Sequence, residues 1–587
     1  MIKKSRIKRM KYFLITTSDK RSWGSYQNNI FLGSWCESFG KENPENLKIQ
    51  NYHWDDKEKF ERDIQYLNDL YETKLDELSI AMNKIHNETN NKSFWRIIIG
   101  PWLKSFIDVV FDRYESVNLI HSECEIENTY CLKANYLNWT PKDFNEYLNL
   151  IKFDEWNHLI YSEIIKYIGI PFNEIKTPLI RLSGGKRKNP LKKLFNHINN
   201  YYNKLLPNKF NKNFVVAGYF KPLQLIKFHF FLKQIPQFLN YELEINRAKP
   251  IKTDVRSKII LNSNDKFEVL LNDLIRKQIP TAYIESYKLI KKKTIKFFPK
   301  HPAVILTSNG YDSNEAFKFW VASKKESINT KYIINQHGGN FGICFYNQSE
   351  KHQILTSDIF TTWGWIDSNN KKIKPMPSYK LQQLKYKRRN NISNIQLLVA
   401  SYPKHFYTLV DQPNASQNIE YFKGIESLLN KLENNVKRKL KIRIHQDLYG
   451  WKVKQRFCEL GYRDSLEDST SISFKNSINN SSISICTFNS TTFLETLSAN
   501  VPTLIFFSSN RYLIRDNAKP MFEKLKNVKI FFETPEELAK HLNDIHLDIY
   551  DWWNQQELQS TKNEFCYNYA RKSENWASIW VDLFETL

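Results

Sequence analysis

Residues 303–339 read AVILTSNGYDSNEAFKFWVASKKESINTKYIINQHGG. The apolar run at 303–307 has the unbroken pattern of a strand that is buried on both faces of a parallel sheet. A helical stretch at 314–325 and a second apolar run at 331–335 follow it. The stretch therefore predicts a strand, a helix and a second parallel strand, which is the repeating unit of a doubly wound sheet.

A second series of the same kind follows the polar stretch 366–393, which we expect to link two domains. Its strands are expected at 395–400, 441–444, 483–486, 503–507 and 528–532, with helices between them. Toward the N-terminus, 11–17 is a further strand candidate, and 93–117 is a helical segment that we expect to break at Gly100-Pro101. Residues 183–210 are polar and basic and are expected to form an exposed excursion.

These patterns predict an α/β protein with two Rossmann-like doubly wound domains, helical insertions and a C-terminal helical segment. The expected divisions are 1–10 as an N-terminal extension, 11–380 as the first domain with its insertions, 381–545 as the second domain and 546–587 as the C-terminal helices. Ligands of open α/β sheets bind beyond the carboxyl ends of the strands. The polar residues after each apolar run are therefore the candidates for a site.

Composition limits the class of protein. The 587 residues are 41% hydrophobic and 14% aromatic, which argues against a disordered chain. The seven cysteines include no C-x-x-C pair, so neither a zinc ribbon nor a thioredoxin motif is present. No apolar run approaches the roughly 20 residues needed to span a bilayer, so we expect a cytoplasmic protein.

The chain carries 86 Lys and Arg against 62 Asp and Glu, a net charge of +24. We interpret this charge first as a solvated lysine-rich surface, and second as a weak attraction to the anionic inner face of the cell membrane. The basic clusters are dispersed, and no nucleic-acid-binding module accompanies them. We therefore expect no nucleic-acid partner.

The strongest binding candidate is a hydroxyl-rich turn that follows the strand at 483–486. Ser490, Thr491 and Thr492 lie where this turn opens a helix, and Glu495 follows on that helix. Free N–H groups at a helix N-terminus, together with hydroxyl groups, can bind a phosphate. Glu495 could accept hydrogen bonds from a ribose or sugar hydroxyl. The alternative is ordinary capping of the helix by Ser490 or Thr491.

Two histidines are expected at strand ends. His445 follows the strand at 441–444 and could face a donor phosphate, or it could simply cap a turn. His337 stands between Gln336 and the pair Gly338-Gly339, whose lack of side chains permits close backbone approach. His337 could act as an acid or base or bind phosphate, whereas the alternative is a glycine turn with an incidental histidine.

Carboxylates supply the candidates for a general base. Asp312 and Glu315 follow the strand at 303–307, and either could deprotonate an acceptor hydroxyl. The alternative is that Asp312 or Ser313 simply caps the helix that begins nearby. Asp358 is a further candidate. No D-x-D pair suited to a metal-bound sugar nucleotide is present, so we predict no metal.

Short stretches spaced along the chain resemble a family of transferases from O-antigen and surface-carbohydrate gene clusters. They include FLITT at 13–17, FLGSWC at 31–36, WRIIIGPWL at 95–103, FKFW at 317–320, QHGG at 336–339, WGW at 363–365, YGW at 449–451 and NVPT at 500–503. The resemblance implies a GT-B-like fold and a transferase of surface polysaccharide assembly. A more distant resemblance is to GT-B transferases that use CMP-activated ulosonic acids, which often carry His-Pro where this chain has His445-Gln446.

The sequence thus predicts a metal-independent glycosyltransferase without a cofactor, whose co-substrate is a nucleotide sugar and whose acceptor is a glycan or a lipid-linked glycan. Asp312 would activate the acceptor and His337 would stabilise the leaving phosphate. The donor would be bound by His445, Ser490, Thr491, Thr492 and Glu495. Two alternatives stay open: a sugar-nucleotide epimerase of the same fold, and a non-catalytic carbohydrate-assembly protein.

Overall fold

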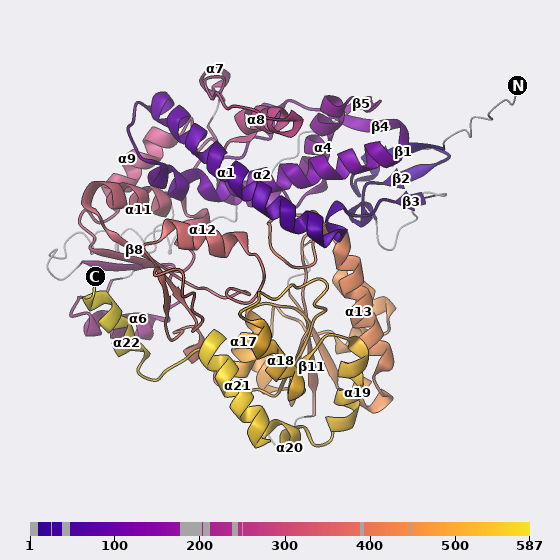
Figure 1. The fold of residues 1–587 in the computed structure, drawn as a ribbon, viewed down its shortest axis with the longest axis vertical. Helices are drawn as coiled ribbons and strands as arrows, with labels where there is room; N and C mark the ends of the chain where they lie inside the picture. The colour runs from indigo at the N-terminus through magenta and orange to yellow at the C-terminus, as the bar shows by residue number, and fades with distance from the viewer. Residues whose placement is uncertain are drawn as a thin grey trace, which may run out of the picture.

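A computed structural model describes residues 10–24, 26–37, 47–176, 202, 212–237, 245–248, 250–387, 393–445 and 449–587. Figure 1 shows the arrangement of its helices and strands. The expected N-terminal extension, except for residue 10, and the expected excursion at 183–210, except for residue 202, lie outside the described residues.

The described residues form three five-stranded sheets, and every strand pair in them is parallel. The first sheet has the order β3-β2-β1-β4-β5, with strands β1 (Lys11–Ile15), β2 (Asn29–Phe31), β3 (Leu47–Ile49), β4 (Glu125–Lys133) and β5 (Asn173–Lys176). The second has the order β10-β9-β8-β7-β6, with β6 (Asn213–Val216), β7 (Val304–Thr307), β8 (Lys331–Asn335), β9 (Ile359–Thr362) and β10 (Ile373–Pro375). The third has the order β12-β11-β13-β14-β15, with β11 (Ile395–Val399), β12 (Leu440–Ile444), β13 (Ile483–Cys486), β14 (Thr503–Phe506) and β15 (Phe531–Phe532).

The predicted α/β class is confirmed, but the first part of the chain holds more than was expected. Residues 11–380, expected to form one Rossmann-like domain, contain two of the three sheets. Strands β2 and β3 have three residues each, and β5 reads NEIK with no buried side chain. Such strands lack the apolar run by which a buried parallel strand is recognised.

Helices cover the sheets and connect their strands. In the first two thirds of the chain they are α1 (Lys57–His86), α2 (Lys92–Glu123), α3 (Phe144–Leu150), α4 (Asp154–Ile168), α6 (Pro222–Phe231), α7 (Thr253–Arg256), α8 (Lys266–Gln278), α9 (Tyr287–Phe297), α10 (Gly310–Ser313), α11 (Glu315–Ile328) and α12 (Gln348–Thr356). In the last third they are α13 (Asn418–Lys431), α14 (Asn434–Lys437), α15 (Val453–Glu459), α16 (Phe474–Asn479), α17 (Thr491–Ser498), α18 (Lys519–Asn527), α19 (Pro535–Ile545), α20 (Ile549–Trp553), α21 (Gln556–Tyr569) and α22 (Trp576–Glu585).

Helix α2 runs without interruption through Pro101, so the break expected at Gly100-Pro101 is wrong. Proline in a helix interior costs about 3 kcal/mol or more. The helix tolerates this cost because it is buried along most of its length, where tertiary packing outweighs local propensity. It packs against α1, α4, α8, α11 and α12.

The third sheet is tied to the N-terminal part of the chain by hydrogen bonds to backbone oxygens. Arg113 of α2 donates from Nη2 to the oxygen of Phe406 at 2.7 Å, and Ser105 donates to the oxygen of Tyr407 at 3.3 Å. The loop that follows β11 is thereby held against α2. At the C-terminus, α22 returns to pack on α6 beside the second sheet.

Candidate functional site

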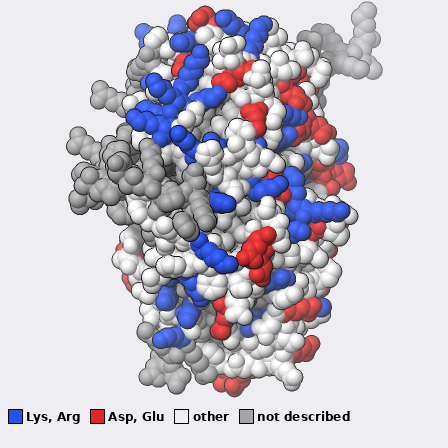
Figure 2. All heavy atoms as spheres, turned by 90° about the vertical axis from the view of Figure 1, so that its left-hand side faces the viewer, with Lys and Arg blue, Asp and Glu red and all other residues white. Residues whose placement is uncertain are grey.

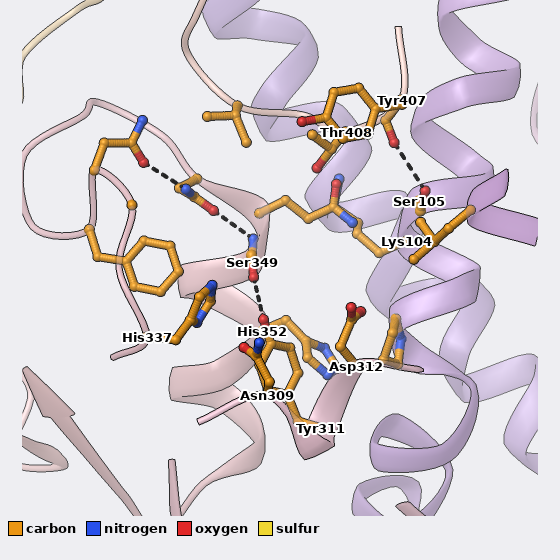
Figure 3. A pocket seen from close by; sticks show the side chains of 18 of the residues that line it. Lys104, Ser105, Asn309, Tyr311, Asp312, His337, Ser349, His352, Tyr407 and Thr408 are labelled. Atoms are coloured by element: carbon orange, nitrogen blue, oxygen red, sulfur yellow. Dashed lines mark hydrogen bonds between the residues drawn. The ribbon is translucent and has the colours of Figure 1, made fainter. Parts of the chain in front are cut away.

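A cavity of about 390 Å³ lies where the carboxyl ends of strands from the second and third sheets meet helix α2. Figure 3 shows the side chains that point into it. Helix α2 contributes Lys104 and Ser105, and the segment after β7 contributes Asn309, Tyr311 and Asp312. The loop after β8 contributes His337 and Gly339, helix α12 Ser349 and His352, the loop after β11 Tyr407 and Thr408, and the turn before α17 Asn489 and Ser490.

Four of the predicted site residues therefore line one cavity, although they are far apart in the sequence: Asp312, His337, Gly339 and Ser490. All four follow a strand at its carboxyl end, on two different sheets. This is the place where an open parallel sheet binds its ligands.

The loop after β8 lies directly on the N-terminus of α17. The backbone N–H of Gly339 donates to Thr491 Oγ1 at 2.6 Å. A Cβ on Gly338 would lie 2.3 Å from the same oxygen, and Gly338 has a φ of +148°. Gly338 is thus required by the close approach of the loop to Thr491. The two motifs that the sequence analysis treated separately form one structure.

Lys380 holds the same two elements together from the other side. Its Nζ donates to the backbone oxygen of His337 at 3.0 Å and lies 3.6 Å from Glu495 Oε1. Burial raises the pKa of the Glu495 carboxyl, although the neighbouring Lys380 ammonium acts in the opposite direction. Glu495 does not line the cavity. Its carboxylate instead lies beside the Lys380 ammonium.

The ionisable groups of the cavity have shifted protonation equilibria. Burial raises the pKa of Asp312 to about 6, against the opposing charges of Lys318 and Lys152. Burial and the nearby Lys380 lower the pKa of His337 to about 4, against a hydrogen bond with Gln353. At neutral pH Asp312 is therefore mainly a carboxylate and His337 a neutral imidazole.

Asn489 is a candidate site residue that the sequence analysis did not single out. It is 2% exposed, lines the cavity, and neither atom of its side-chain amide has a hydrogen-bond partner. A buried polar group without a partner costs about 1–3 kcal/mol, so its retention calls for an explanation. Ser490, the next residue, precedes α17 without a side-chain capping bond. The turn therefore presents an unpaired amide, a hydroxyl and a helix N-terminus together.

Lys104 and His352 were also missed by sequence reasoning. Burial lowers the pKa of both, that of His352 to about 3, and Lys104 is paired with Asp108 on the next turn of α2. Both residues lie within helices rather than after strands. Their position at the cavity depends on how α2 and α12 pack, which no local motif indicates.

Three predicted candidates do not line the cavity, and their side chains bind other parts of the protein. Glu315 is buried: its Oε1 accepts hydrogen bonds from Phe144 N and Tyr283 Oη, and its Oε2 lies 3.0 Å from Lys318 Nζ. Gln336 accepts from the backbone of Trp363 and the indole of Trp365, both at 2.9 Å. Asp358 precedes β9, at the opposite edge of the sheet from the cavity, and binds Lys325 at 2.5 Å.

His445 and Thr492 do not line this cavity. Thr492 is half-buried on the first turn of α17, and His445 is exposed at the end of β12, the edge strand of the third sheet. Tyr449 and Gly450, which follow His445 in the chain, line a second cavity of about 780 Å³. Lys152 borders that second cavity, and its positive charge lowers the pKa of Asp312, which lines the first cavity. The two cavities are therefore neighbours.

The model of one protein family matches residues 12–584, and its description is LIC12162 family transferase. The chain belongs to this transferase family. This membership confirms the transferase resemblance that the sequence analysis stated. Among curated proteins, none matches the sequence.

This member of the LIC12162 family is distantly similar to several solved structures. MurG of Acinetobacter baumannii is 12% identical, with 78% of this chain and 99% of that chain covered and a TM-score of 0.30. WaaG, a glycosyltransferase involved in lipopolysaccharide biosynthesis, is 10% identical, with 51% and 95% covered and a TM-score of 0.27. The N-terminal domain of Candida albicans trehalose-6-phosphate phosphatase is 9% identical, with 73% and 86% covered and a TM-score of 0.29.

Within the part of the chain that the structure describes, no group of three or more His, Cys, Asp or Glu side chains is arranged to hold a metal ion. None of the helices formed by the described residues combines the length and the apolar character that crossing a bilayer requires.

Proposed function

We propose that this family member is a glycosyltransferase of the GT-B type, which moves a sugar from a nucleotide donor to a surface-polysaccharide acceptor. The observation that carries the proposal is the meeting of Asp312, His337 and the Asn489–Ser490 turn around one cavity. These groups supply a base, a neutral hydrogen-bond donor and an anion-binding helix N-terminus. Membership of a transferase family supports the same class of reaction.

The donor phosphate would bind at the start of α17. The free N–H groups of the first turn favour an anion, and the Asn489 amide would gain the partner that it lacks. Thr491 accepts from Gly339 through Oγ1, which leaves its own hydrogen free to be donated. Glu495 would accept from a sugar or ribose hydroxyl while Lys380 balances its charge.

In the reaction, Asp312 would accept the proton of the acceptor hydroxyl as that oxygen attacks the anomeric carbon. The bond between this carbon and the donor phosphate oxygen breaks, and the electron pair leaves with the phosphate. The neutral imidazole of His337 would donate a hydrogen bond to the leaving group, and the α17 N-terminus would offset its charge. We propose that these protein groups act without a metal ion.

The finer assignments follow from the sequence and belong to the same proposal. The donor is a nucleotide sugar, with CMP-activated ulosonic acids as one candidate, and the acceptor is an O-antigen type glycan or its lipid-linked precursor. The enzyme would work in the cytoplasm, at the inner face of the cell membrane. His445 would contact the donor where the donor extends from the first cavity toward the end of β12.

A thermal-shift series tests the proposal. CMP, CDP, UDP and GDP are added in turn, and the bound nucleotide should raise the melting temperature by mass action. Asp312→Asn should keep this shift but lose transfer, whereas Asn489→Ala should reduce the shift. If none of the nucleotides raises the melting temperature of the wild type, the donor site is wrong. Conversion of a sugar nucleotide without acceptor would instead identify an epimerase.

The pH dependence of the wild type offers a second test. The base is active as the carboxylate, and the pKa of Asp312 is about 6. Transfer measured as kcat/KM should therefore fall as the pH drops through about 6, approaching a tenfold loss for each pH unit below it. A rate that stays level down to pH 4 would exclude Asp312 as the base.

A further inference from the structure

Helix α6 has an apolar face that the described protein leaves uncovered. Its inner face carries Phe228, which is fully buried and packs on Phe584 of α22 with ring centroids 5.4 Å apart. Its outer face carries Leu223, Phe230 and Phe231, which are 80%, 65% and 45% exposed. Positions 223, 230 and 231 lie on one side of a helix, because they are seven and eight residues apart.

Lysines surround this apolar face. Lys221, Lys227 and Lys233 are all exposed, and Lys227 lies on the same side as Leu223. The described stretch 212–237 contains no Asp or Glu. In the sequence, no acidic residue occurs between Glu174 and Glu242, whereas 13 Lys and Arg do. An apolar helix face with a lysine border and no acidic residue fits the surface of an anionic bilayer.

Helix α9 repeats the pattern on the same side of the molecule (Figure 1). It exposes Leu289 and Ile295 between the exposed lysines Lys288, Lys292 and Lys296. Figure 2 faces this side and shows Lys and Arg gathered over its upper part. The positive charge that would meet the membrane is therefore not confined to α6.

We infer that α6 lies in the surface of an anionic membrane leaflet, with Leu223, Phe230 and Phe231 in the boundary of the acyl chains and the lysines at the lipid phosphates. Helices of this kind bind through buried apolar area together with attraction to anionic lipids. The inference gives the proposed membrane association a definite structural element.

The position of α6 connects this surface to the cavity. The helix follows β6 at the carboxyl edge of the second sheet, the edge at which Asp312 and His337 lie. Tyr219, in the loop between β6 and α6, is hydrogen-bonded to Asn309, which lines the cavity. A membrane-bound α6 would hold the cavity next to the bilayer, where a lipid-linked acceptor is found. This last step rests on the proposed function.

Vesicle sedimentation tests the membrane contact without reference to catalysis. The full chain is mixed with vesicles of phosphatidylcholine and phosphatidylglycerol, and separately with vesicles of phosphatidylcholine alone. We expect binding to the first only, decreasing as salt screens the lysines. Replacing Lys221, Lys227 and Lys233 by Gln should weaken binding about 100-fold, since each lysine near the surface contributes about fivefold.

The apolar part is tested by Leu223→Ser combined with Phe230→Ser. Leu547→Ser is the matched control, because Leu547 is 75% exposed and lies between α19 and α20. The double variant should lose vesicle binding while the control keeps it, and circular dichroism should show unchanged melting for both. A double variant that binds like the wild type would overturn the inference, as would a wild type that is dimeric and becomes monomeric only in the double variant.

The result of the vesicle experiment does not depend on whether the proposed donor site is correct. Nucleotide stabilisation of the double variant should match that of the wild type. Loss of vesicle binding with intact nucleotide stabilisation supports the membrane surface. Absence of nucleotide stabilisation in the wild type would count against the proposed function and leave the vesicle result unchanged.

Discussion

The contact between Gly338 and Thr491 predicts a specific coupling between two parts of the chain that are about 150 residues apart. Gly338→Ala places a Cβ at 2.3 Å from Thr491 Oγ1, where real Cβ atoms essentially never come within 3.0 Å. The positive φ of Gly338 adds backbone strain of about 1–3 kcal/mol. The forced contact adds overpacking of about 1–3 kcal/mol. We expect the free energy of unfolding to fall by the sum of both.

Thr491→Ala separates the two contributions. It removes the oxygen that the new Cβ would meet and costs about 0.5–1.5 kcal/mol for the lost bond from Gly339. In this background Gly338→Ala should retain the backbone strain but lose the overpacking. The double-mutant cycle should therefore give an interaction energy of about 1–3 kcal/mol in favour of the double variant.

Urea unfolding of the wild type, the two single variants and the double variant measures this cycle. Gly339→Ala is a useful control, because its new Cβ would approach only Phe341, at 3.5 Å, while its φ of +79° is also strained. It should show the strain without coupling to Thr491. Strictly additive effects of Gly338→Ala and Thr491→Ala would refute the contact between the loop and α17.

Three further predictions concern single side chains. Asn489→Ala should weaken nucleotide binding about tenfold in isothermal titration, through a lost hydrogen bond of about 1.5 kcal/mol, whereas the protein without ligand should unfold no more easily than the wild type. Lys380→Met should change the free energy of unfolding by less than about 1 kcal/mol in urea titrations, yet reduce kcat about 100-fold because the loop after β8 shifts. Asp154 is half-buried, and although burial raises its pKa, the hydrogen bond with His405 at 2.7 Å, the charges of His405 and Lys404 and the hydrogen bond from Ser18 together lower that pKa to about 2. Since this lies below the ordinary 3.8, Asp154 stabilises the fold above pH 4 by about 2 kcal/mol, and the contribution is lost as the pH falls toward 2; acid unfolding of Asp154→Asn should lack this step.

The strands that build the cavity could be predicted from the sequence because each is a short apolar run. The runs at 303–307 and 331–335 correspond to β7 and β8, and those at 395–400 and 483–486 to β11 and β13. The separate first sheet could not be predicted, since β2 and β3 are too short to show periodicity. Its strands are defined by pairing with β1, which is a tertiary property.

The residues of the candidate site likewise divide into those that the sequence could predict and those that it could not. Asp312, His337 and Ser490 could be found because they follow strands, and strand ends are recognisable. Lys104 and His352 could not, because a position within a helix does not indicate which sheet edge the helix will cover. Asn489 stood in the predicted turn directly before Ser490, but only its burial without a partner distinguishes it from an ordinary turn residue.

The attachment of the third sheet to α2 bears on how substrates enter and leave. The guanidinium of Arg113 is fully buried, and it also binds Asn157 and Asp112. A rigid-body hinge that swung the third sheet away from α2 would remove the Phe406 oxygen from this buried ion, while Asn157 and Asp112 would stay with it, at a cost of about 1.5–3 kcal/mol for the lost charge-assisted hydrogen bond. Exchange of product for substrate should therefore proceed by movement of surface segments, while the angle between the sheets stays constant through the catalytic cycle.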